Sequence, residues 1–116
     1  MEEKPIIVYR MTGGITRSHH RIEIYKDGKV LAYWRPEDSK QHSILEQELR
    51  DILDAFHANN FFSMQRCYCE KSIQDPTTHE LTYDYQDRTH TVSVTSGSQP
   101  EEFWNIISEM GRLLFR

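Results

Sequence analysis

The chain has few cysteines and no long apolar run, and each scarcity excludes a class of protein. Two cysteines, Cys67 and Cys69, are too few for the disulfide framework of a small secreted domain. The apolar runs are a few residues long, far short of the roughly 20 that span a bilayer. The acidic start, from Met1 to Pro5, lacks the apolar stretch of a secretory signal. We therefore expect reduced cysteines, a cytoplasmic location and no membrane partner.

The sequence also has fewer basic than acidic residues. The sequence holds 14 Lys and Arg against 18 Asp and Glu, for a formal net charge of −4. Nucleic-acid-binding domains usually carry a basic patch and a high isoelectric point, so a nucleic-acid partner is not expected. The 116 residues contain no repeat, low-complexity tract or linker. We therefore expect a single domain over residues 1–116.

Runs of β-branched and aromatic residues predict three strands in the first third of the chain. They are expected over Pro5–Met11, around Ile22 and Ile24, and over Val30–Trp34. Asp27-Gly28 lies between the second and third runs. An Asp-Gly pair in this position favours a hairpin with a type I′ turn.

Two stripes of apolar residues at a 3.6-residue period predict two helices. The stripes are Leu45, Leu49, Ile52, Leu53 and Phe56, and then Phe103, Ile106, Ile107, Met110 and Leu114. Ser43 with Glu46 fits a capping box, so the first helix is expected to start at Ser43. Asn59-Asn60 suits a left-handed cap at its end. The expected core includes Leu49, Leu53, Phe56, Val92, Ile107 and Leu114.

More strands are expected between the two helices. They are a short one before Cys69 and two alternating ones over Leu81–Tyr85 and His90–Val94. A two-residue turn at Gln86-Asp87 would pair Tyr83 with His90 on the apolar face. The sequence therefore predicts an α+β domain of order βββ-α-βββ-α. Its sheet is expected to be mostly antiparallel, with both helices packed on one face.

The polar clusters do not form a catalytic motif. The sequence has neither a Gly-x-Ser-x-Gly elbow nor the paired-ligand spacing of a zinc site. Cys67, Cys69 and His90 are weak metal candidates, and two small half-buried thiols are the favoured interpretation. We therefore expect no catalytic residue, metal or cofactor. A small metal- or thiol-dependent enzyme is the alternative from another functional class.

The segment after the first strand is the expected partner-binding surface. It contains Gly13, Gly14, Arg17, His19, His20 and Arg21. Glycines let a backbone approach a partner closely, and arginines bind carboxylates through planar donors. Tyr25 and Tyr33 are placed on the sheet face opposite the helices, where ordinary cross-strand packing is favoured over an extension of this surface. These features favour a non-enzymatic protein-interaction domain.

The order of features resembles the small emfourin-like domains. The matching features are Gly13-Gly14, Asp27-Gly28, Phe61-Phe62, Asp75-Pro76, Leu81-Thr82-Tyr83, Thr91–Val94 and Pro100. The named member of that family inhibits thermolysin-like metallopeptidases, so the resemblance implies a binding protein with a metallopeptidase as one partner. Gly13, Gly14 and Asp75 are the residues it carries over to a partner site. The stretch from Arg17 to Trp34 departs from the family pattern. A dimerising structural module is a further alternative, and the chain is expected to be a monomer or a homodimer.

Overall fold

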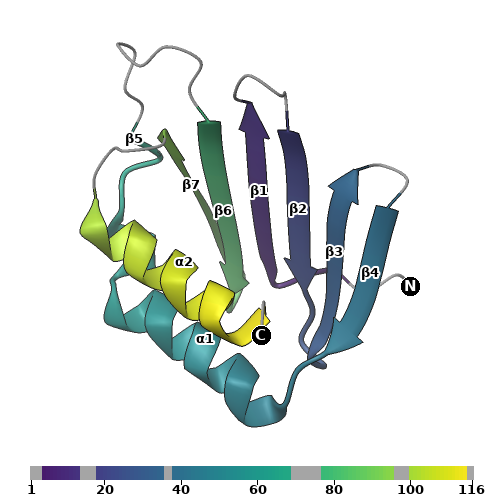
Figure 1. Cartoon of the computed structure of the whole chain (residues 1–116). Coiled ribbons are helices and arrows are strands. Elements are labelled where there is room, and N and C mark those ends of the chain that lie inside the picture. Colours follow the sequence, from purple (N-terminus) through teal and green to yellow (C-terminus); the bar gives the residue numbers. More distant parts are fainter. Residues whose placement is uncertain (1–3, 14–17, 36–37, 69–76, 96–99, 115–116) are drawn as a thin grey trace.

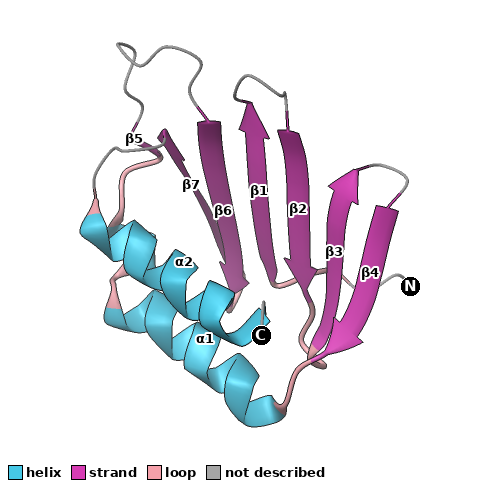
Figure 2. Ribbon diagram, in the orientation of Figure 1, coloured by secondary structure: helices cyan, strands magenta, loops and turns pink. Residues whose placement is uncertain are grey.

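Strands precede each helix along the chain (Figures 1 and 2). The computed structural model describes residues 4–13, 18–35, 38–68, 77–95 and 100–114. The elements are β1 (Ile7–Gly13), β2 (Ser18–Ile24), β3 (Lys29–Arg35), β4 (Asp38–Ser43), α1 (Glu46–Ala58), the 3-10 turn η1 (Phe61–Ser63), β5 (Cys67–Tyr68), β6 (Thr77–Tyr85), β7 (Arg88–Thr95) and α2 (Glu101–Leu114).

The seven described strands form one sheet in the order β4-β3-β2-β1-β6-β7-β5. Every neighbouring pair is antiparallel except β5 and β7, which run parallel. The predicted α+β class with a mostly antiparallel sheet is therefore confirmed. The strand β4 was not expected, because its sequence, Asp38–Ser43, is polar and carries no apolar alternation. It is an edge strand with exposed side chains from Lys40 to Ser43, so no buried face shapes its pattern.

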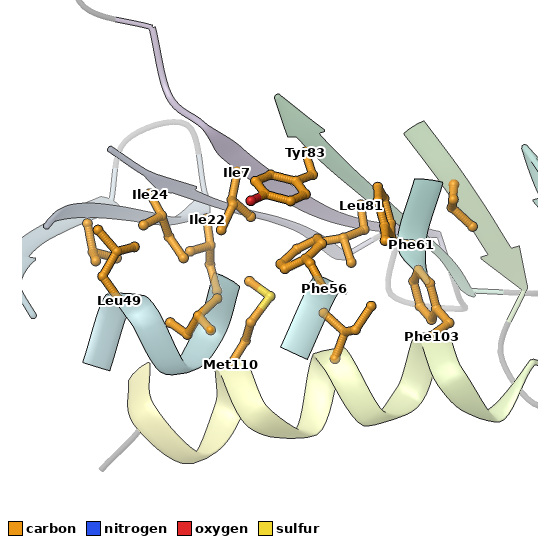
Figure 3. Close-up of a cluster of buried hydrophobic side chains, with 14 of the residues drawn as sticks. Ile7, Ile22, Ile24, Leu49, Phe56, Phe61, Leu81, Tyr83, Phe103 and Met110 are labelled. Atoms are coloured by element: carbon orange, nitrogen blue, oxygen red, sulfur yellow. The ribbon is translucent and has the colours of Figure 1, made fainter. Parts of the chain in front are cut away.

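Both helices pack on the same face of the sheet. Phe56 of α1 lies 4.5 Å, between ring centroids, from Tyr83 of β6. Trp104 of α2 lies 5.0 Å from His79 on the same strand. His79 and Tyr83 are four residues apart, so their side chains leave β6 on one face. Figure 3 shows the buried side chains between the sheet and the two helices.

The core lies between this sheet face and the helices. The largest fully buried side chains are Tyr83, Phe56, Phe61, Phe103, Ile7, Ile24, Ile52, Leu81, Ile106, Val30, Val92 and Val94. The predicted core residues Leu49, Phe56 and Val92 are buried. Leu53 and Ile107 are only partly buried, because they flank the apolar stripes of their helices. The side chain of Leu114 lies outside the described residues.

The β6–β7 turn has the predicted position and two-residue length. Gln86 and Asp87 have φ angles of 49° and 63°, the positive values that a type I′ turn needs at both central residues. Tyr83 pairs with His90 and Leu81 with Val92, in the register expected from the sequence. The turn length therefore places the apolar residues of both strands on the helix side of the sheet.

The β2–β3 hairpin exists, but the predicted turn type is wrong. Tyr25 N–H donates to the Lys29 carbonyl at 2.9 Å, which closes a three-residue loop. Within this loop the positive φ is that of Gly28, at 93°. This is the pattern of a turn followed by a glycine bulge. A Cβ at Gly28 would lie 2.8 Å from the Ile44 carbonyl oxygen. The β2–β3 loop therefore needs glycine at this position for a second reason, because any larger residue would clash with the Ile44 backbone.

The start of α1 also differs from the prediction. The helix begins at Glu46, after Ser43 has paired with Lys29 at the end of β4. The Leu45 N–H donates to Glu48 Oε1 at 2.9 Å, so Glu48 has the capping role expected of Glu46. Because pairing with β3 holds Ser43 in the sheet, the helix begins at Glu46 and not at the predicted Ser43. At the other end, Asn60 has a φ of 53°, which confirms the left-handed cap.

Replacing Ile52 by alanine should destabilise the fold more than replacing Leu53. Ile52 is fully buried, and its neighbour Leu53 is only partly buried. We expect Ile52→Ala to lower the free energy of unfolding by about 2–5 kcal/mol, because it leaves a cavity in the core. Leu53→Ala should cost clearly less. Chemical denaturation measures both changes, and an equal loss in the two variants would show that the buried face of α1 is misplaced.

Candidate functional site

Strand alternation divides the expected partner surface between the two faces of the sheet. On β2, His20 lies opposite Met11 of β1, and Arg21 lies opposite Arg10. Adjacent strand residues point to opposite faces, so His20 lies on the helix side and Arg21 on the open side. Gly13 ends β1 with a φ of 105° and pairs with Ser18. Its backbone conformation is one that favours glycine.

The rest of the expected partner set is described incompletely. Gly14, Arg17 and Asp75 lie outside the described residues. His19 is described by its backbone alone, as a residue of β2 opposite Thr12. Of this set, the structure describes the side chains of His20 and Arg21, and these two lie on opposite faces of the sheet.

His20 lines an apolar pocket between the sheet and α2, which we call the β1–α2 pocket. Its volume is about 210 Å³, and its lining residues are Tyr9, Met11, His20, Ile22, Ile107, Met110 and Gly111. The floor consists of two neighbouring residue pairs, Tyr9 with Ile22 and Met11 with His20. Figure 3 shows Met110 directed from α2 toward the sheet near Ile22. The pocket is open to solvent and mostly apolar, as binding pockets usually are.

Gly111 helps to leave this space open. It lies in the interior of α2 and lines the pocket. Glycine in a helix interior costs about 0.5–1 kcal/mol relative to alanine, so it is an unfavourable choice for the helix alone. At this position the missing side chain keeps α2 from filling the gap above β1 and β2.

A hydrogen-bonded pair lies at the side of the pocket nearest β6. Tyr9 Oη lies 2.6 Å from His79 Nδ1. Burial raises the pKa of Tyr9 to about 12, so the phenol is protonated at neutral pH and donates this hydrogen bond. Burial lowers the pKa of His79, which favours the neutral imidazole that accepts it. Tyr9 therefore presents mainly its ring to the pocket.

Arg21 is held on the open face of the sheet. Its Nη2 lies 2.7 Å from Glu23 Oε2, and the Tyr25 hydroxyl donates to the other oxygen of this carboxylate at 3.2 Å. Tyr25 and Tyr33 share this face, as expected, because Tyr33 lies opposite Arg21 and Tyr25 is two residues beyond Glu23. Glu23 is buried despite facing away from the helices. The arginine therefore neutralises a buried carboxylate, a structural role that the sequence did not indicate.

Two of the three weak metal candidates, Cys67 and His90, take part in other interactions. Cys67 is disulfide-bonded, so the expectation of reduced cysteines was wrong for this residue. The sequence spacing gave no sign of this bond, and Cys69 lies outside the described residues. His90 Nε2 donates to the Met64 carbonyl at 2.8 Å. Among the residues that the structure describes, no three His, Cys, Asp or Glu side chains group together as metal ligands would.

Sequence reasoning missed most of the residues that line the pocket. Tyr9 and Met11 alternate with the polar Arg10 and Thr12, a signal that could have placed them on one face of β1. Ile107 was expected in the core but lines the open pocket instead. The contact between β1 and the end of α2 joins residues about a hundred positions apart, so no local pattern could indicate it.

Comparison with known protein families places the chain in one of them. The family model described as "Domain of unknown function (DUF6438)" matches residues 19–114, which is most of the chain. The protein belongs to the DUF6438 family. The match in this DUF6438 domain runs from β2 to α2 and leaves out β1. No curated protein matches the chain.

The stability of the domain should fall on acidification, in part because of His79. Its pKa is lower in the folded state than in the unfolded chain, so the unfolded state binds this proton first as the pH drops. This contribution to stability is present above about pH 6.5 and is lost as the pH falls toward the folded-state pKa. We expect His79→Phe to reduce the drop in melting temperature between neutral and mildly acidic buffer.

The matched control is His42→Phe, because His42 is exposed on β4. It should leave the pH dependence of the melting temperature as in the wild type. Thermal unfolding followed by circular dichroism measures all three proteins. An unchanged pH dependence in His79→Phe would contradict the assigned role of His79.

Proposed function

We propose that this DUF6438 domain is a non-enzymatic interaction domain whose β1–α2 pocket receives an apolar side chain of a protein partner. The observation that supports this most directly is the pocket itself, which is open and apolar and lies at the junction of three elements. Its volume of about 210 Å³ is below the roughly 300–1,000 Å³ of sites for drug-sized ligands. One large aliphatic or aromatic side chain suits this size.

The energetics of such an anchor favour recognition of a protein segment. Burying one large apolar side chain contributes about 1.5–3 kcal/mol. That is too little for tight binding alone, so the partner needs further contacts around the pocket. The end of the β1–β2 hairpin, with Gly13 and His20, lies next to the pocket and can supply them. Loops and strand ends on a rigid sheet are common positions for such contacts.

Inhibition of a metallopeptidase is a narrower form of this proposal. It is supported by the sequence resemblance to emfourin-like domains and by no contact in the described residues. The match to a domain of unknown function neither adds to it nor removes it.

The compartment in which the domain acts stays a prediction. A cytoplasmic location is expected from two features of the sequence, the lack of a secretory signal and a cysteine count typical of reduced thiols. The disulfide at Cys67 removes the second of these supports, since disulfides persist mainly in oxidising compartments. No helix among the described residues is long and apolar enough to cross a bilayer.

A charge placed at the pocket should weaken the binding of an apolar side chain there. We expect Ile107→Glu to weaken binding of a peptide selected from a display library against the wild-type domain by about tenfold or more. The matched control is Leu45→Glu, because Leu45 is 70% exposed and lies outside the pocket. Isothermal titration calorimetry measures the affinities, and thermal unfolding checks that each variant is folded.

The milder variant Met11→Ala removes part of the pocket wall and keeps the test decisive if Ile107→Glu unfolds. The affinity of Met11→Ala for the selected peptide should also be lower than that of the control Leu45→Glu. Affinities that stay at the wild-type value in both pocket variants would refute the pocket as the anchor site.

A further inference from the structure

A second concave site lies between α1 and β6, which we call the α1–β6 groove. Its volume is about 430 Å³, and its lining residues are Gln47, Arg50, Leu53, Asp54, His57, Tyr83 and Tyr85. None of these residues lines the β1–α2 pocket. The five helix residues lie on one flank of α1, beside the stripe that enters the core. The groove combines aromatic rings with polar side chains, whereas the β1–α2 pocket is mostly apolar.

Two rings form a corner in this groove. The ring centroids of His57 and Tyr85 are 4.8 Å apart, and the ring planes meet at 72°. His57 is held in place by a contact of 3.1 Å between its Nε2 and the Tyr83 hydroxyl. Tyr83 is itself fully buried, so it acts as a fixed support. The corner is therefore preorganised, and Tyr85 and His57 are its accessible rings.

Asp54 adds a negative charge to the corner. It lies one helical turn before His57 and close enough to Tyr83 to contribute to the raised pKa of that phenol. Its carboxylate makes no hydrogen bond or ion pair with any residue that the structure describes. The cation of the groove, Arg50, pairs instead with Glu46 at 2.9 Å. A second nearby arginine, Arg88, lies over the Phe62 ring at 4.3 Å.

We propose that the α1–β6 groove binds an organic cation, an alkylammonium or quaternary ammonium group. The cation would lie against the rings of Tyr85 and His57, with the Asp54 carboxylate as its counter-ion. Aromatic faces attract cations through the ring quadrupole, and this is how aromatic cages recognise quaternary ammonium groups. An anion would meet the carboxylate and the electron-rich ring faces and be repelled. A single cation–ring contact of this kind occurs elsewhere in the chain, where Lys29 Nζ lies 4.3 Å from the centre of the Tyr25 ring.

The charge of the ligand is the first property to test. Choline and its uncharged carbon isostere, in which a tert-butyl group replaces the trimethylammonium group, have the same shape. Titration of the whole domain with each, followed by nuclear magnetic resonance, reports on amides of α1 and β6. We expect saturable shifts around Asp54 and Tyr85 with choline and none with the isostere. Equal shifts with both compounds, or no saturable shift with any cation tested, would overturn the proposal.

Two variants test the residues. Asp54→Asn removes the charge with little change in shape, and Tyr85→Leu removes the aromatic wall. We expect each to weaken choline binding about fivefold or more. The matched control is Asp84→Asn, on the same strand as the tyrosines but on the opposite face of the sheet, and it should bind as the wild type does. If Asp84→Asn weakens binding as much as Asp54→Asn, the effect is one of overall charge and the assignment to the groove fails.

A third titration separates the two sources of such a cation. Nα-acetyl-lysine methylamide carries the ammonium group of a protein side chain, and choline carries a free quaternary group. Binding of either ligand supports the site if Asp54→Asn and Tyr85→Leu both weaken that binding. Tighter binding of the lysine derivative assigns the groove to a protein segment, and tighter binding of choline assigns it to a small molecule or headgroup.

Discussion

One face of the sheet is buried under two helices and the other is not, and most of the structure depends on this asymmetry. Ile7 pairs with Ile24 on one side and with Tyr83 on the other, and all three are fully buried. Side chains alternate along these strands, so a slip of one residue between β1 and either neighbour would move an entire apolar set into solvent. The two-residue turn at the end of β6 and the three-residue loop after β2 hold the registers of the adjoining strand pairs.

The same asymmetry determines which surfaces are available for binding. The two helices do not cover the whole sheet, and in Figure 1 the edge strand β4 lies beside them. The β1–α2 pocket lies where α2 passes over β1 and β2 without filling the gap at Gly111. The α1–β6 groove lies on the flank of the other helix. Both sites follow from incomplete cover of one sheet face, and neither needs an additional element.

Local sequence patterns predicted the elements that depend on neighbouring residues alone. The stripe through Leu49 and Phe56 predicted α1, and a short even loop at Gln86-Asp87 predicted the register of β6 and β7. The start of α1 was misplaced because β4, a polar edge strand, continues to Ser43. The pocket was missed because Tyr9 and Met110 meet only after folding. The sequence indicated His20 as part of a loop surface. Its place in an apolar pocket depends on which face of β2 its side chain leaves, and that follows from the pairing of β2 with β1.

The most direct test of this account is a methyl nuclear Overhauser experiment on the whole domain. The methyl groups of Ile7, Ile24 and Leu81 lie in one buried cluster with Ile52 of α1 and Ile106 of α2. Val8 and Leu31 belong to the opposite face by their strand pairing with Glu23. The account predicts cross-peaks between the first set and the helix methyls, and none from Val8 or Leu31 to either helix. Cross-peaks from Val8 or Leu31 to Ile52 or Ile106 would contradict it, because they would place a helix on the face assigned as open.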